Sequence, residues 1–121
     1  MIVAGFGFRA AADMSALRLA LASAQRGHPA VTALAGPDDK LALLGALAEA
    51  MALPLVPVSP AALQAMATPT QSPVSLHHRV IGSVAEACAL AAAGPGAVLL
   101  ASRHISPDRM ATCAIAQGPA A

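Results

Sequence analysis

The sequence predicts an α/β fold: a three-layer sandwich with a mixed, mainly parallel sheet of about five strands. Short β-like runs alternate with helical patterns along the chain, which is typical of βα units. The composition agrees, because 57% of the residues are apolar although only 2% are aromatic. A core of small and aliphatic side chains lets helices lie close to a sheet. The 121 residues suffice for one domain, expected to span residues 1–121.

The first half of the chain contains three predicted strands. We expect them at residues 2–6, 30–34 and 53–58. The third strand holds Pro54 and Pro57, which lack the N–H groups that a central strand donates, so it is expected at an edge. Intervening helical patterns separate these strands, so the strands are predicted to be parallel neighbours.

Capping residues, glycine and proline mark the expected helix ends. Four helices are expected, starting at Asp13 or Ser15, at Asp38 or Asp39 after Gly36-Pro37, at Ser59-Pro60, and at Ser83 in the capping box Ser83–Glu86. The first helix is expected to stop at Gly27 and the last at Gly94-Pro95-Gly96. Each start offers a side-chain oxygen to the unpaired N–H groups of the first helical turn.

The second half of the chain combines a long loop with a closing hairpin. Helical and strand periodicity fail between residues 67 and 82, which predicts a loop, partly extended near its end. Residues 97–101 and 110–116 read as two final strands. The segment between them is too short for a crossover helix, so they are predicted to pair antiparallel, which makes the sheet mixed.

Charge and hydropathy exclude several classes of partner. Seven Lys and Arg stand against six Asp and Glu with no basic stripe, so no nucleic acid is expected. The apolar stretch 87–102 is interrupted by Gly94-Pro95-Gly96, so no membrane span is expected. The beginning of the chain does not read as a secretory signal, which predicts a cytoplasmic protein. Cys88 and Cys113 lack metal-ligand spacing and are expected to be buried small hydrophobes.

Candidate ligand-binding residues follow the first two strands. Gly5-x-Gly7 lacks the third glycine of a dinucleotide fingerprint, so we interpret it as exposed backbone that a ligand can approach, with Arg9 as a fixed cation. The alternative is a tight turn with Arg9 on the surface. Lys40 opens a helix, where a cation is unfavourable against the helix dipole. Either a bound anion or an ion pair with Asp38 or Asp39 explains it.

Titratable residues elsewhere do not form a recognisable catalytic set. His77-His78-Arg79 is the densest cluster, but adjacent histidines on an extended segment point to opposite faces, so no metal site and no cofactor are expected. Arg103-His104 is a second candidate cation pair, with a solvated turn as the alternative. Ser83 and Glu86 are first of all capping residues. The catalytic residues therefore stay unknown, with Glu86 as a candidate base.

Five segments occur in the order found in a known family: Gly5–Arg9, Lys40, Thr70–Ser72, Gly82–Leu90 and Ala111–Ala116. Together they resemble the CobE family of cobalamin biosynthesis proteins, which is similar to the C-terminal domain of CbiG. The resemblance extends over essentially the whole chain. Its most specific part is the run Ser-Val-Ala-Glu-Ala within the fourth segment.

The resemblance implies work on corrin-ring intermediates, in the aerobic pathway in which CobE is a separate protein. CbiG-type proteins open a ring-contracted lactone, so a cobalt-precorrin-5A hydrolase-like activity is one alternative, with Glu86 or a histidine as base. A scaffold for other cobalamin-pathway enzymes is another. The family often has Cys where this chain has Phe8 and Glu where it has Leu43. A thiol or carboxylate at these positions therefore has no role here.

A precorrin or hydrogenobyrinic-acid-type tetrapyrrole is the expected ligand, since it carries acetate and propionate groups around an apolar ring. A matching site offers helix N–H groups, a few Arg or Lys and an apolar floor. The predicted ligand-binding residues are Gly5, Gly7, Arg9, Lys40, Thr70, Ser72, Ser83, Glu86 and Thr112. We expect converging strand ends to bring them together.

Overall fold

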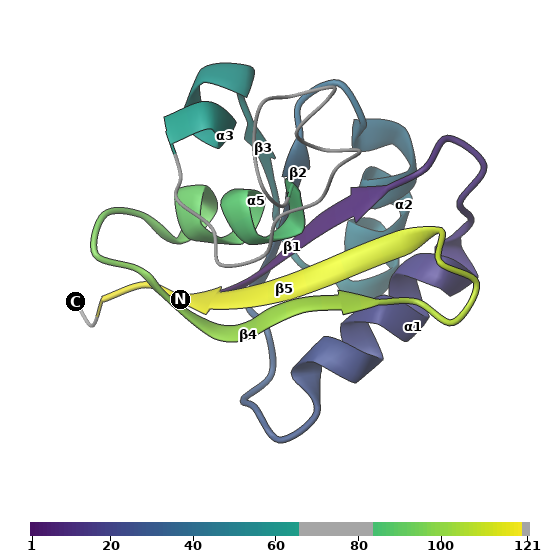
Figure 1. Ribbon diagram of the computed structural model, residues 1–121, viewed down its shortest axis with the longest axis horizontal. Coiled ribbons are helices and arrows are strands. Elements are labelled where there is room, and N and C mark those ends of the chain that lie inside the picture. Colours follow the sequence, from purple (N-terminus) through teal and green to yellow (C-terminus); the bar gives the residue numbers. More distant parts are fainter. Residues whose placement is uncertain (66–83, 120–121) are drawn as a thin grey trace.

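The computed structural model describes residues 1–65 and 84–119 and contains a five-stranded sheet in the order β3-β2-β1-β5-β4 (Figure 1). The strands are β1 (Ile2–Phe8), β2 (Ala33–Pro37), β3 (Leu55–Val58), β4 (Val98–Ile105) and β5 (Ala111–Gln117). The first three are parallel, whereas β5 runs antiparallel to both β1 and β4. The predicted mixed α/β sheet, its edge strand β3 and its C-terminal hairpin are confirmed.

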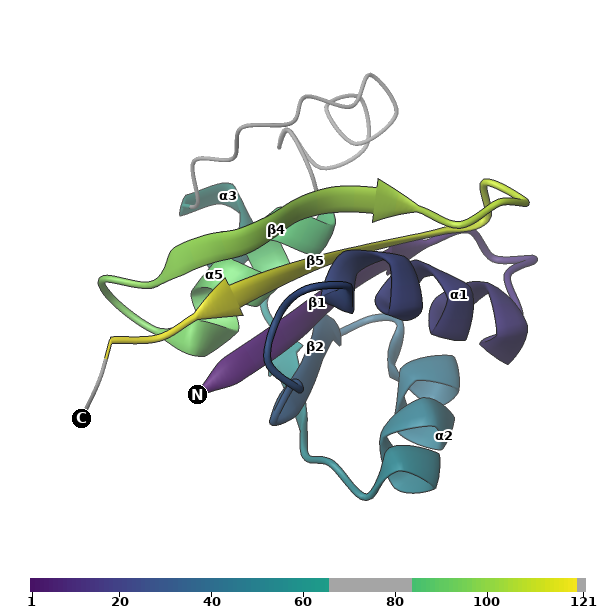
Figure 2. The same ribbon diagram turned by 90° about the horizontal axis from the view of Figure 1, so that it is seen from below.

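Helices cover both faces of this sheet, which gives the three predicted layers (Figure 2). The helices are α1 (Met14–Gln25) and α2 (Leu41–Met51) on one face, and α3 (Pro60–Ala65) and α5 (Val84–Ala93) on the other. Side chains alternate along each strand, so each face has a core of its own. Phe6 belongs to the α1 and α2 side, and Val3 to the α5 side.

The α5 face of the sheet is made of small residues. Gly5 and Gly7 of β1 lie on it beside Ala114 and Thr112 of β5, with which they pair. A Cβ on Gly5 would collide with backbone atoms of α5, the Ala85 carbonyl oxygen and the Ala89 nitrogen. The helix backbone therefore rests directly on β1. This close contact confirms the prediction that small side chains let a helix lie near the sheet.

Two of the predicted helix caps form as expected. The Asp13 carboxylate accepts a hydrogen bond from the Ala16 amide at 2.9 Å, and α1 begins at the next residue, Met14. The Ser59 hydroxyl accepts one from the Ala62 amide at 3.2 Å and precedes α3. These side chains satisfy N–H groups that have no partner within the helix.

Several strand boundaries differ from the prediction. β1 continues to Phe8 and β4 to Ile105, while β2 starts three residues later than expected and includes Gly36-Pro37. Proline is accepted there because it is the last residue of β2. The amide of Asp38 then donates to the Val58 carbonyl at 3.0 Å and continues the pairing with β3.

The predicted cap of α2 is wrong. The N-cap residue is Lys40, whose side chain makes no capping bond. The Lys40 amide donates to the Pro37 carbonyl at 3.0 Å, so the chain turns tightly after β2. Asp38 and Asp39 belong to this turn and lie before the first helical residue. The predicted loop at 67–82 and the cap at Ser83 lie outside the described residues.

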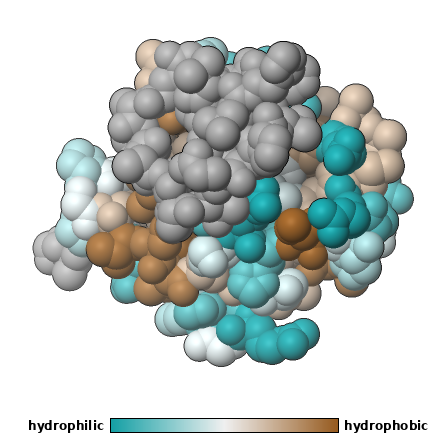
Figure 3. Space-filling model, in the orientation of Figure 1, coloured by the Kyte–Doolittle hydropathy of each residue, from teal (hydrophilic) through white to brown (hydrophobic). Residues whose placement is uncertain are grey.

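Both cysteines are buried, as predicted, Cys88 on α5 and Cys113 on β5. Hydrophobic side chains are nevertheless exposed at the edge of the sheet. Figure 3 shows a hydrophobic patch at the lower left of the view, over the start of β4, where Val98 is 59% exposed. Among the described residues, no helix has the length and apolar character needed to cross a membrane.

Candidate ligand-binding site

The carboxyl ends of the parallel strands, which we call the carboxyl edge of the sheet, bring together several of the residues that the sequence singled out. The parallel strands β1, β2 and β3 end there at Phe8, Pro37 and Val58. Because β5 is antiparallel and Ala111 pairs with Phe8, the turn between β4 and β5 lies at the same edge. Ligands of open α/β sheets bind at the carboxyl ends of the strands. The predicted convergence therefore holds for Arg9, Lys40 and Thr112.

Lys40 lies at this edge against the end of β1. Its Nζ donates to the Phe8 carbonyl oxygen at 3.0 Å and lies 5.5 Å from the centroid of the Phe8 ring. A carbonyl oxygen and an aromatic face therefore stabilise the ammonium group at the start of α2. The sequence analysis, which expected either a bound anion or an ion pair, did not predict these two contacts. An ammonium has three donors. One of them is used here, directly beside the peptide that joins Phe8 to Arg9.

Arg9 continues the line of cations toward the hairpin. Its amide donates to the Met110 carbonyl at 2.9 Å, which extends the pairing of β1 with β5 by one bond. Its Nε donates to the Arg109 carbonyl at 3.4 Å, and both arginines are exposed. We call Lys40, Arg9 and Arg109 the cationic row. Sequence reasoning missed Arg109, although the preceding Ser-Pro-Asp run is a turn signal.

Gly7 and Thr112 connect the cationic row to the start of α5. The Thr112 hydroxyl donates to the Gly7 carbonyl at 3.2 Å. A Cβ on Gly7 would lie 3.0 Å from that hydroxyl oxygen and 3.2 Å from the Val84 Cβ. The first residue of α5 therefore lies directly over Gly7. The partly positive end of this helix and the cationic row share one edge of the sheet.

Gly5 has a different role from the predicted one. It is buried in the middle of β1, and α5 covers the side on which a Cβ would stand. The glycine is needed because the helix backbone approaches it. A ligand has no access to it in this structure.

Glu86 is fully buried in the first turn of α5. Its Oε2 accepts a hydrogen bond from the Arg103 amide at 2.9 Å. The register of β4 on β5 shifts between Ala101 and His104, and the carboxylate binds an amide in that irregular stretch. A buried carboxylate bonded to backbone ties α5 to β4, so the structure gives Glu86 a packing role. Its predicted capping partner Ser83 lies outside the described residues.

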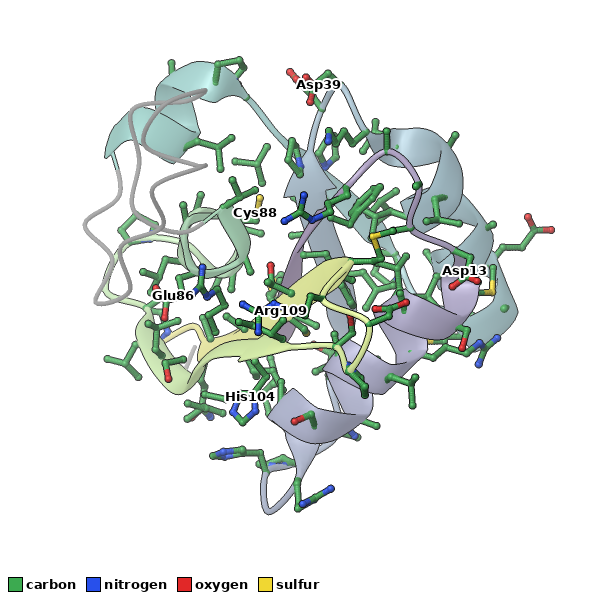
Figure 4. The ribbon with its side chains drawn as sticks, turned by 45° about the vertical axis from the view of Figure 1, so that its right-hand side comes forward. Asp13, Asp39, Glu86, Cys88, His104 and Arg109 are labelled. Atoms are coloured by element: carbon green, nitrogen blue, oxygen red, sulfur yellow. The ribbon has the colours of Figure 1, made fainter. Side chains whose placement is uncertain are left out.

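The predicted cation pair Arg103-His104 lies within β4 and not in a turn. His104 Nδ1 is 3.0 Å from the Ser23 hydroxyl of α1. Figure 4 shows His104 and Glu86 on opposite sides of β4, His104 toward α1 and Glu86 on α5. The two residues therefore do not share a site. The remaining predicted positions lie outside the described residues: Thr70, Ser72, His77, His78 and Ser83.

In the last hairpin, the surroundings shift the pKa values of two titratable groups in opposite directions. Hydrogen bonds from the Ser106 hydroxyl and the Met110 amide hold the pKa of Asp108 below its usual value, so this carboxylate is ionised and engaged in the turn. Burial raises the pKa of the Cys113 thiol well above its ordinary value. Residues 1–65 and 84–119 contain no group of three or more metal-ligating side chains.

The family described as "Cobalamin synthesis G C-terminus" matches residues 2–116 of the chain. The chain belongs to this family. It is 31% identical to CobE, a protein from the cobalamin (vitamin B12) biosynthetic pathway, with a TM-score of 0.84, covering 96% of this chain and 89% of that one. It is 36% identical to the cobalamin biosynthesis protein chiG from Agrobacterium tumefaciens str. C58, with a TM-score of 0.76, covering 99% and 100% of the two chains.

A cobalamin biosynthesis protein G homolog from Sulfolobus solfataricus shares the fold of this family member. It has a TM-score of 0.73 at 19% identity, and the match covers 98% of this chain and 37% of that one. No curated protein matches the sequence. The resemblance that the motifs indicated is confirmed, and the chain is a protein of the cobalamin biosynthesis pathway.

Proposed function

We propose that this cobalamin synthesis G C-terminus protein binds a late precorrin or hydrogenobyrinic-acid-type tetrapyrrole in the cytoplasm, at the carboxyl edge of its sheet. It carries the intermediate or hands it over, in the aerobic pathway, without independent catalysis. The observation that carries the proposal is the cationic row. Lys40, Arg9 and Arg109 are linked through backbone carbonyls and stand beside the start of α5.

The chemistry of the ligand fits this arrangement. A precorrin carries several carboxylates around an apolar ring, and guanidinium and ammonium groups are the side chains that pair with carboxylates most strongly. Within the described part of the chain, the contacts of Arg9 and Lys40 are made to carbonyl oxygens and a ring. Each cation therefore retains N–H donors for a ligand.

Titration with hydrogenobyrinic acid tests the proposal. The tetrapyrrole spectrum in the visible region is followed as protein is added, at low and high ionic strength. We expect saturable binding that weakens with salt, because exposed charge pairs are screened. No spectral change at tens of micromolar protein would contradict the proposal.

Arg9→Ala tests the site. We expect a dissociation constant roughly 10-fold larger, as for loss of one charge-assisted hydrogen bond. The melting temperature should change little, because an exposed side chain with one long hydrogen bond contributes little to stability. Arg26→Ala is the matched control, since Arg26 is an exposed arginine at the opposite end of α1. A large drop in melting temperature with unchanged affinity would make Arg9 a structural residue.

Two further experiments separate the alternative functions. Turnover of a lactone precorrin by the purified protein would favour a hydrolase. The buried Glu86, already bonded to the Arg103 amide, is poorly placed as its base. Binding of another pathway enzyme in the absence of any tetrapyrrole, seen as a shift in size-exclusion chromatography, would favour a scaffold.

A further inference from the structure

In the turn between β4 and β5, every residue but one is of a type that suits the backbone conformation at its position. The Ser106 hydroxyl donates to the Asp108 carboxylate and accepts from the Ala111 amide, and the same carboxylate accepts from the Met110 amide. Serine, proline and aspartate are the residues that such turns prefer. The Arg109 amide closes the turn on the Ser106 carbonyl at 2.8 Å.

Arg109 is the exception, because its φ is 62°. This is the left-handed region, where a Cβ crowds the backbone and glycine is the favoured residue. Turns of this kind usually have glycine at the corresponding position. The side chain of Arg109 is exposed, and it forms no hydrogen bond with another described residue that would offset the strain. Turn stability therefore does not account for an arginine here.

The position of Arg109 in the candidate site explains why an arginine occurs in this turn. The Arg109 carbonyl accepts a hydrogen bond from Arg9 Nε, and the next carbonyl, that of Met110, accepts from the Arg9 amide. These two bonds fix the turn to Arg9, the residue that follows β1. Figure 4 labels Arg109 near the middle of the view. Strained residues that the surrounding structure holds in place are concentrated at binding and catalytic sites.

We propose that Arg109 is a ligand-binding residue, whose guanidinium pairs with a carboxylate of the same polycarboxylated ring that Arg9 contacts. The left-handed backbone keeps this side chain at the carboxyl edge at the expense of turn stability. This inference rests on the proposed function and adds to it a contact that the sequence did not reveal. It also assigns the third member of the cationic row to substrate recognition and not to folding.

Three variants separate binding from stability. Arg109→Gly removes the guanidinium and the backbone strain together. We therefore expect a melting temperature about 3 to 5 °C higher. The dissociation constant for hydrogenobyrinic acid should be roughly 10-fold larger. Arg109→Ala removes the guanidinium but keeps the Cβ, so it should weaken binding equally with little change in melting temperature. Ala52→Gly is the control.

Ala52 is the other described non-glycine residue with positive φ, 56°, and it ends α2 at the opposite edge of the sheet. Its replacement by glycine should raise the melting temperature by a similar amount and leave the dissociation constant unchanged. This control shows whether relief of strain by itself alters binding.

The outcomes distinguish this inference from the function on which it rests. If the unaltered protein binds hydrogenobyrinic acid and both Arg109 variants bind equally well, the assignment of Arg109 is overturned and the proposed function stands. If the unaltered protein does not bind, both are overturned. If Arg109→Gly fails to raise the melting temperature while Ala52→Gly raises it, the explanation by strain is wrong.

Discussion

Gly5→Ala is expected to disrupt the packing of α5 on the sheet. The new Cβ would point at the Ala85 carbonyl oxygen and the Ala89 nitrogen. Both are backbone atoms, so no side chain can rotate away. The helix must shift as a unit or tilt, and α5 is buried against β1 along much of its length.

The expected loss follows from the kind of contact. Extra methyl groups in a well-packed core typically cost about 1 to 3 kcal/mol. A collision with helix backbone belongs at the upper end, so we expect a free energy of unfolding lower by about 3 kcal/mol. For a chain of 121 residues this corresponds to a melting temperature roughly 10 °C lower.

Gly45→Ala provides a matched control for the same chemical change. Gly45 lies inside α2, and a Cβ there meets nothing within 4 Å. Alanine is the better helix former, so this variant should gain about 0.5 to 1 kcal/mol. Urea unfolding followed by circular dichroism measures both. If the free energy of unfolding of Gly5→Ala lies within about 0.5 kcal/mol of that of the unaltered protein, the close contact of α5 with β1 is refuted.

Three further predictions concern single side chains. Lys40→Met loses the bond to the Phe8 carbonyl and the contact with its ring, so urea unfolding should show a loss of about 1 kcal/mol; an unchanged midpoint would contradict this contact. Glu86→Ala leaves the Arg103 amide without its acceptor and should lose about 2 to 3 kcal/mol. Glu86→Gln keeps an acceptor oxygen and should lose less, and equal losses would argue against this role. Burial raises the pKa of the Cys113 thiol, so the unfolded chain releases its proton first as pH rises above 9.0. Stability should then fall by about 1.4 kcal/mol per pH unit, a slope that Cys113→Ala should remove.

Much of the fold was predictable because its signals are local. Asp13 caps α1 through an amide three residues away, and Ser59 caps α3 in the same way. The short connection between the last two strands requires an antiparallel pair. The predicted second strand, residues 30–34, begins three residues before β2 does, because the register of β2 is decided by its neighbours β1 and β3 and not by its own pattern.

The candidate site was predictable in part. Arg9, Lys40 and Thr112 were named from the sequence and do lie at one edge. The contacts of Lys40 and Glu86 were not predicted, because their partners Phe8 and Arg103 are distant in sequence or selected by a register shift. Local patterns carry no information about such partners.

The sequence by itself determined the order of helices and strands, the use of small residues in the core and the family. These follow from periodicity, capping and motifs, which depend on residues close together in the chain. Only the tertiary structure decided that Gly5 supports a helix and that Arg109 joins Arg9 at the carboxyl edge. The reason is physical: a contact between residues 9 and 109 exists only once the sheet has brought β1 beside β5.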